Sequence, residues 1–292
     1  MDPRIIEITS PGLSVGVSTL GAELAFIRDA NGADLLWNGD PAVWAGRAPI
    51  LFPIIGMLAN GRYRLGGRSY ALAKHGFARG ADFQTVEKGP DEVVMRLTPN
   101  AATWEAYPFA FQLDLRFAVS ASRLKITATI ANHGAAPMPA SFGFHPAFRW
   151  PLPYGEPRRD HFIQFAAEET GPLRRINRDG LLTSALLPTP IKDGRLTLRD
   201  ALFDDDALIF DPIKSRSVTY GAGAGPRIRI GYNDLPNLGV WTKPGAGYIC
   251  IEPWQGVADP EGFEGEIWEK PGIIVIAPGA ARDVSIEITL EP

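Results

Sequence analysis

The sequence has one cysteine, no basic excess and no long apolar run. A lone cysteine, Cys250, cannot form an internal disulfide, which fits a reducing compartment such as the cytoplasm. Lysine and arginine number 29 against 33 acidic residues, so the net charge is -4 and a nucleic-acid partner is not expected. No stretch approaches the roughly 18 apolar residues of a membrane-spanning helix, and no secretory signal is visible at the N-terminus. These absences predict a soluble cytoplasmic protein with no membrane partner.

Helical periodicity is also scarce, and apolar residues recur instead at every second position. Turn residues separate such runs, in keeping with 31 glycines and 26 prolines. The clearest alternating runs are 93–97, 111–117, 124–130 and 284–290. This pattern predicts an all-β fold, a large antiparallel β-sandwich with little helix.

Turn signals and the absence of a linker complete the expected organisation. The best helix candidate is 101–107, stopped by Pro108. Asn60-Gly61 and Gly66-Gly67 are hairpin signals, and the glycine-rich run 221–225 lies between two strand patterns, so a hairpin loop is expected there rather than a phosphate-binding loop. No Ser-rich, Gly-rich or charged linker divides the chain, so residues 1–292 are expected to form a single domain.

Three segments place ionisable residues among apolar or aromatic neighbours, where burial is costly without a partner or a task. In the first, His75 is followed by Gly76, which permits close backbone approach, and by Arg79, a cation that could hold a hydroxyl or an anion. A surface turn that happens to contain a histidine would explain the same residues. This segment alone does not decide between the two interpretations.

The second segment, 140–148, has two different faces if it is extended, as the proline after His145 favours. One face carries alanine, proline and three phenylalanines for packing. The other carries Ser141, Gly143, His145 and Ala147, so small residues leave room for a ligand over the histidine. A core histidine bonded to a backbone carbonyl is the alternative.

The third segment, 248–256, places a carboxylate in an aromatic strand. Alternation puts Tyr248, Cys250, Glu252 and Trp254 on one face. Desolvation would raise the pKa of Glu252, which suits a general base, and the two aromatic rings could stack on a sugar. A structural glutamate paired with Arg79 is the alternative.

Metal and cysteine chemistry are less well supported by the sequence. No two histidines have ligand spacing such as His-x-His, so no metal site is expected. Cys250 has no activating motif and fits inert packing. His133 and His161 are expected in exposed turns.

The three segments together resemble the aldose 1-epimerase (galactose mutarotase-like) superfamily, in particular its bacterial LacX-like branch. The resemblance covers nearly the whole chain and includes 48–56, 75–79, 145–148, 206–210, 238–242 and 250–254 in the family's order. It implies a β-sandwich whose concave face binds a small-molecule sugar, and an isomerase that needs no cofactor.

The resemblance also implies a role for each matching residue. Glu252 resembles the base that takes the anomeric proton, and His145 the acid that protonates the ring oxygen. His75 resembles the second histidine, which steadies that oxygen. Arg79, Asp206 and Trp254 are the expected substrate-binding residues.

One departure and two alternatives accompany this interpretation. Met57 stands where relatives commonly carry an arginine, although Arg62 or Arg64 could compensate. A hexose-6-phosphate 1-epimerase would use an arginine cluster built from Arg79 with Arg47, Arg62 or Arg64. A carbohydrate-binding module without turnover would keep the same fold.

The sugar, the pathway and the oligomeric state are not encoded in these motifs. Loops 154–159 and 233–237 are candidates for sugar specificity. A monomer or a homodimer fits the sequence.

Overall fold

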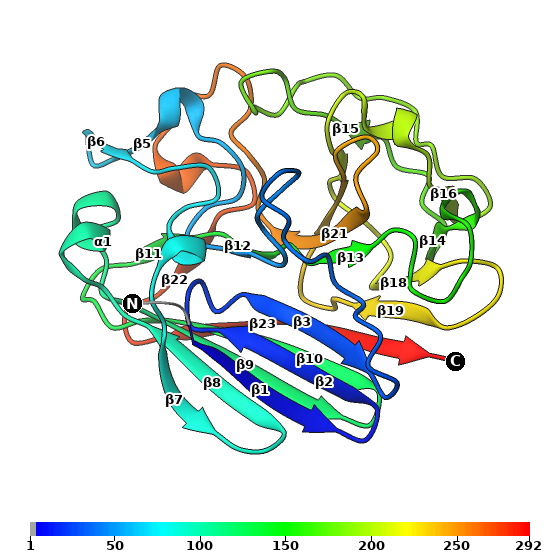
Figure 1. Cartoon of the computed structure of the whole chain (residues 1–292). Helices are drawn as coiled ribbons and strands as arrows, with labels where there is room; N and C mark the ends of the chain where they lie inside the picture. The colour runs from blue at the N-terminus through cyan, green and yellow to red at the C-terminus, as the bar shows by residue number, and fades with distance from the viewer. Residues whose placement is uncertain (1–3) are drawn as a thin grey trace.

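The computed structural model describes residues 4–292, and its largest sheet has nine antiparallel strands in the order β16-β14-β18-β19-β23-β10-β9-β8-β7 (Figure 1). Period-2 burial along the strands confirms the expected all-β class: Ile126 of β10 lies opposite Phe117 of β9 and Ile286 of β23, all buried. The strands are β7 (Gln84–Lys88), β8 (Glu92–Leu97), β9 (Phe111–Ser120), β10 (Arg123–Asn132), β14 (Phe162–Phe165), β16 (Arg195–Thr197), β18 (Ser217–Gly221), β19 (Arg227–Gly231) and β23 (Ala281–Glu291).

A seven-stranded antiparallel sheet forms the second layer. Its order is β15-β17-β20-β21-β12-β4, with β13 also pairing β21. β21 is buried from Tyr248 to Trp254 because one face packs into the core and the other lies beneath loops. The strands are β4 (Ile50–Leu51), β12 (Phe142–Phe144), β13 (Ala147–Arg149), β15 (Leu173–Arg174), β17 (Leu208–Phe210), β20 (Asn237–Trp241) and β21 (Tyr248–Gln255).

Smaller elements surround the two layers. The sheet β1-β2-β3 lies against β8 and β9, in front of them in Figure 1. The remaining strands and the helix are β1 (Ile5–Ser10), β2 (Leu13–Ser18), β3 (Leu24–Asp29), the hairpin β5 (Arg62–Leu65) and β6 (Arg68–Ala71), the pair β11 (Met138–Ala140) and β22 (Ile274–Ile276), and α1 (Ala101–Ala106). Single 3₁₀ turns are at Ala59–Gly61, Ala78–Gly80, Arg158–Asp160, Asp200–Phe203 and Ile267–Glu269.

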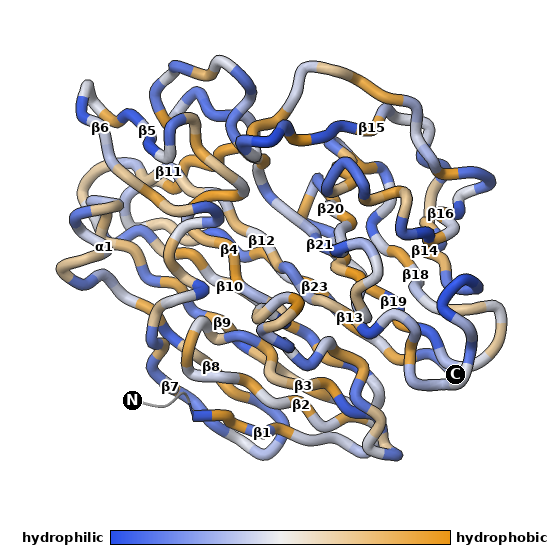
Figure 2. The backbone as a smooth tube through the Cα atoms, turned by 45° about the horizontal axis from the view of Figure 1, so that its top comes forward, coloured by the Kyte–Doolittle hydropathy of each residue, from blue (hydrophilic) through white to orange (hydrophobic). Residues whose placement is uncertain are grey.

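One apolar cluster joins the two large sheets. It draws side chains from β1–β3, from the long strands β8–β10 and β23, and from β12, β20 and β21. Figure 2 shows apolar and polar residues alternating along these strands. The single-domain expectation for residues 1–292 agrees with this shared core and stays a prediction.

Two local expectations were wrong and two were confirmed. Gly66-Gly67 turns the β5–β6 hairpin and 221–225 joins β18 to β19, as expected. Asn60-Gly61 instead forms a 3₁₀ turn, in which Asn60 takes a positive φ of 56°. Segment 140–148 is not one strand: pairing with β4 ends at Phe144 and pairing with β21 resumes at Ala147, on either side of Pro146, which has no N–H to donate. No helix within 4–292 is long and apolar enough to cross a membrane.

Candidate active site

The seven-stranded sheet and the loops above it enclose a pocket of ≈ 150 Å³, called here the central pocket. Glu252 comes from the middle of β21, His145 from the break between β12 and β13, and His75 from the loop after β6. Strand alternation in 248–256 and the two faces of 140–148, which persist across the break at Pro146, explain this meeting. Phe142, Phe144 and Ile251 face the core, whereas His145 and Glu252, which follow the last two of these, line the pocket.

In the central pocket His145 Nε2 lies 3.1 Å from Glu252 Oε2, between side chains 9% and 3% exposed. Burial raises the pKa of Glu252 well above its usual range, although the positive charge of Lys74 opposes the shift. Burial lowers the pKa of His145 well below its usual range. Both shifts disfavour charge, so at rest the two facing groups, 3.1 Å apart, are neutral, and the carboxyl proton is the one that can pass between them. Glu252 thus pairs with His145, not with Arg79.

His75 is held beside this pair by the backbone. Its ring lies edge-on to that of His145, with centroids 5.9 Å apart, and its Nδ1 accepts the N–H of Gly56 at 3.0 Å. Burial, and then proximity to His145, lower the pKa of His75 well below its usual range. A neutral ring whose Nδ1 accepts a hydrogen bond carries its hydrogen on Nε2. His75 can therefore donate to a ligand from that nitrogen.

Charged residues stand at the rim of the central pocket. Arg79 and Asp206 line it, as the sequence predicted, and both are exposed. Asp206 has a φ of 66°, and its Oδ1 accepts the N–H of Ala207. Lys74 also lines the pocket and was missed, because nothing in its sequence context distinguishes it from any other exposed lysine.

Aromatic rings form part of the wall. Trp254 lines the central pocket as expected, but Tyr248 is fully buried and does not line it. Trp44 and Trp241 take the place expected of Tyr248; they meet at 5.5 Å, and both contact the ring of His145. Trp44 lies in a loop with no periodic pattern, which is why sequence reasoning did not identify it.

The arginine cluster expected for a phosphate is not assembled around the central pocket. Arg47 donates to the carbonyl of Ala25, whereas Arg62 and Arg64 face a separate hollow beside the β5–β6 hairpin. Met57 packs against Gly180, where an added Cβ would lie 2.7 Å from the methionine Cγ.

The two loops considered for specificity, 154–159 and 233–237, do not line the central pocket. Among the described residues, Gly180 and Asp206 lie in other loops, and these loops do line the central pocket.

Three further residues, Cys250, His161 and His133, were considered in the sequence. Cys250, His145 and Glu252 place potential ligand atoms within 4.8 Å of one another, but burial raises the pKa of the Cys250 thiol, which keeps it protonated. The absence of a metal site stays a prediction. His161 was expected to be exposed and is 1% exposed: its Nδ1 donates to the carbonyl of Pro157 and its Nε2 accepts the N–H of Leu152. His133 is exposed, as expected.

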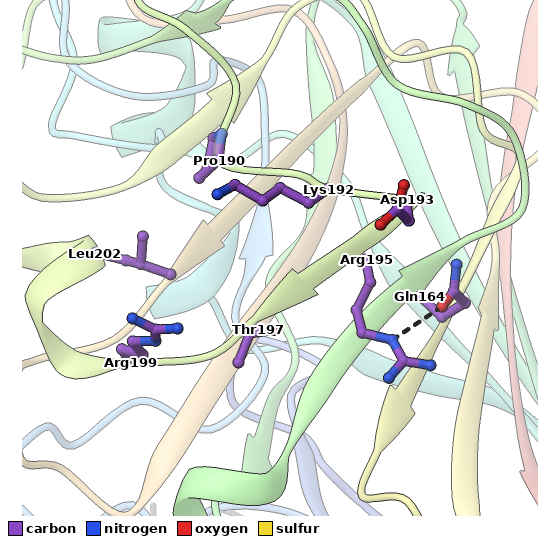
Figure 3. A pocket seen from close by; sticks show the side chains of 8 residues that line it. All are labelled: Gln164, Pro190, Lys192, Asp193, Arg195, Thr197, Arg199 and Leu202. Atoms are coloured by element: carbon purple, nitrogen blue, oxygen red, sulfur yellow. Dashed lines mark hydrogen bonds between the residues drawn. The ribbon is translucent and has the colours of Figure 1, made fainter.

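A second, larger hollow of ≈ 600 Å³ lies at the edge strand β16 (Figure 3). Its cations are Lys192, Arg195 and Arg199, and Arg195 donates to Gln164. It contains none of the expected site residues and no imidazole–carboxylate pair. The central pocket is smaller, but it contains the imidazole–carboxylate pair that could transfer protons.

Comparisons with known proteins agree with this geometry. The chain is 33% identical to the chromosomal protein LacX of Lactococcus lactis subsp. lactis, over 98% of this chain and 99% of that protein. A galactose mutarotase related enzyme from Lactobacillus acidophilus has 28% identity and a TM-score of 0.91, covering 99% of this chain and 98% of that one. A galactose mutarotase-like protein from Lactobacillus casei has 27% identity and a TM-score of 0.92, with 99% and 100% covered. The profile of the family described as Aldose 1-epimerase matches residues 4–275, and the chain therefore belongs to the aldose 1-epimerase family.

Proposed function

We propose that the protein is an aldose 1-epimerase that interconverts the α and β anomers of a single-ring sugar in the central pocket. The observation that supports this most directly is the 3.1 Å contact between His145 and Glu252 on the floor of a pocket of ≈ 150 Å³. One proton donor and one proton acceptor, side by side, are what ring opening requires.

The reaction needs two proton transfers and no covalent intermediate with the protein. Glu252, as carboxylate, takes the proton of the anomeric hydroxyl, and that oxygen becomes the carbonyl as the ring C–O bond breaks. His145 gives its proton to the departing ring oxygen, which the Nε2–H of His75 steadies. Rotation about the bond between the first two carbons and reversal of both transfers give the other anomer. Because the pair holds one exchangeable proton, the active arrangement needs none from solvent.

The test follows the optical rotation of freshly dissolved α-D-glucose and α-D-galactose. Glu252→Gln and His145→Asn should each lower kcat roughly 10²–10⁴-fold, because each removes one proton-transfer group. Glu105→Gln and His133→Asn make the same chemical changes at exposed positions outside the central pocket and should keep full activity.

The sugar-binding module without turnover predicts a different outcome. If no sugar relaxes faster than the blank although binding is detected, and Glu252→Gln leaves the affinity unchanged, the epimerase proposal is wrong.

A hexose 6-phosphate is the second candidate substrate, because Lys74 stands at the rim together with Arg79. Two cations could hold a phosphate even without the arginine cluster. Activity on the phosphorylated but not on the free hexose would select this substrate.

A further inference from the structure

A buried ion pair joins Lys270 to Asp259, the residue that follows Ala258 of the central pocket. Lys270 Nζ and Asp259 Oδ1 are 2.6 Å apart, and the two side chains are 1% and 2% exposed. An ion pair in such surroundings adds little stability over an apolar pair, because both charges lose their hydration. We therefore ask which neighbouring segments the ion pair holds in place.

Asp259 bonds to two loops at once. Its Oδ2 accepts the N–H of Ala59 at 2.8 Å, and its own N–H donates to the carbonyl of Met57 at 2.9 Å. Its carbonyl accepts the N–H of Leu182 at 2.8 Å. Lys270 neutralises the carboxylate that accepts the N–H of Ala59. We call these four contacts of Asp259 the Asp259 clamp.

The first of these loops carries the residue that orients His75. Gly56 donates its N–H to His75 Nδ1, and its carbonyl accepts the N–H of His75 at 2.9 Å. Gly56 also touches Ala258: an added Cβ would lie 2.5 Å from the alanine Cβ. The distance between the Gly56 loop and the segment of Asp259 is therefore fixed by a close contact and, one residue further along each segment, by the clamp.

We infer that Asp259, neutralised by Lys270, is a positioning residue: it holds the Gly56 loop so that His75 keeps its hydrogen on Nε2, available to the ligand in the central pocket. Without the clamp, the Gly56 N–H would no longer be held against Nδ1, and the neutral ring would populate both tautomers. The consequence for turnover rests on the proposed function, whereas the tautomer itself does not.

The first experiment reads the tautomer by long-range ¹H–¹⁵N NMR of the histidine side chains, without any sugar. His75 should show a single Nε2–H form in the unsubstituted protein and a mixture in Asp259→Asn. Glu169→Gln is the matched control, because Glu169 is also buried and accepts two loop N–H groups, from Lys214 and Ser215, away from the central pocket. It should leave the His75 signals unchanged.

A second variant weakens the clamp without touching the ion pair. Ala59→Pro removes the N–H that Oδ2 accepts, and Leu58 already has the extended backbone, φ -94° and ψ 148°, that a following proline favours. It keeps the test valid if Asp259→Asn fails to fold. The same mixture of tautomers, in smaller proportion, is expected.

The second experiment asks whether Asp259 acts through His75. Asp259→Asn should lower kcat by up to roughly 10²-fold, as expected when a group in contact with substrate is misplaced. In a His75→Asn background the same substitution should lower kcat no further, whereas general structural damage would add to the loss.

The outcomes separate the two proposals. A single Nε2–H form in both Asp259→Asn and Ala59→Pro would overturn the role of the clamp, whatever the activity. Full additivity with His75→Asn would also overturn it. If the unsubstituted protein turns over no sugar, the proposed function fails, and the tautomer measurement still decides the inference.

Discussion

At the scale of single residues, the proposed reaction makes the protonation of His145 and Glu252 set the pH range of activity. The pair works when it holds one exchangeable proton; it loses function when it gains a second at low pH or loses the first at high pH. Burial lowers the pKa of His145 and raises that of Glu252, so the two steps move apart.

The pH profile of kcat/KM should therefore show a broad plateau through neutrality. His133→Asn should leave the profile unchanged. A single narrow maximum would contradict the shared-proton description.

Lys74 should matter for both charge and substrate. Its positive charge lowers the pKa of Glu252, so Lys74→Met should move the high-pH limb of the profile further up. If Lys74 binds a phosphate, Lys74→Met should lower kcat/KM for the hexose 6-phosphate roughly tenfold and kcat/KM for the free hexose by less. Lys192→Met, at the larger hollow, is the control for a lost lysine. Equal losses on both substrates would rule out phosphate selection by Lys74.

Glu252 and His145, the proposed proton-transfer pair, could be predicted from alternation along the chain, whereas His75 lies in a loop and was predicted only through the family resemblance. In β21 the period of two places Glu252 on the face away from the core-facing isoleucines. For His145 the signal was the small residues Gly143 and Ala147 on its own face, which leave space over the ring. Lys74 and Trp44 could not be predicted, because a loop side chain is placed by tertiary contacts that no local period encodes. Tyr248 shares the face of Glu252 but lies under Trp44, at 5.2 Å between centroids, and is covered.

At the scale of elements, two glycines make room for Trp254. A Cβ at Gly239 of β20 would lie 2.4 Å from the indole, and one at Gly143 of β12 would lie 2.6 Å from it. The ring thus lies over both neighbours of β21, where side chains would displace it. The position of Trp254 in the pocket wall therefore depends on glycine at 143 and 239.

Gly239→Ala should force Trp254 toward the central pocket, raise KM, and lower the free energy of unfolding by about 1–3 kcal/mol. Urea unfolding measures the loss of stability, tryptophan fluorescence reports the displacement of Trp254, and steady-state kinetics give KM. Gly231→Ala in β19 is the control, because its Cβ would meet the nearest atom at an ordinary 3.9 Å. Equal behaviour of the two variants would show that Trp254 adapts without cost.

At the scale of the whole molecule, buried neutral histidines tie stability to pH. Burial lowers the pKa of His75, His145 and His161 in the folded protein. Below about pH 6.5 the unfolded chain then binds more protons than the folded one, so stability falls as the pH falls. Glu252 acts in the opposite direction, because its raised pKa means that the folded protein holds a proton the unfolded chain has released.

His161→Gln should reduce the loss of unfolding free energy between about pH 7 and about pH 5, since one of these groups no longer titrates. Urea titrations at the two pH values measure it, and the exposed His133→Asn should not change the loss. An unchanged slope in His161→Gln would mean that His161 is protonated in the folded protein.

The architecture of two large antiparallel layers was predictable because alternation continues through the long strands. Strand order was not, because pairing between distant segments leaves no local trace. β23 (281–291) pairs with β10 (123–132) on one side and β19 (227–231) on the other.

That order has a consequence for synthesis. When the ribosome has made residue 280, β10 and β19 both still lack the neighbour that joins them. The nine-stranded sheet then exists at most as two separate parts, each with an open edge. The central pocket belongs to the sheet that shares an apolar cluster with this one, so the pocket is not expected to form fully before β23 has emerged, and open strand edges are exposed to wrong pairing until then.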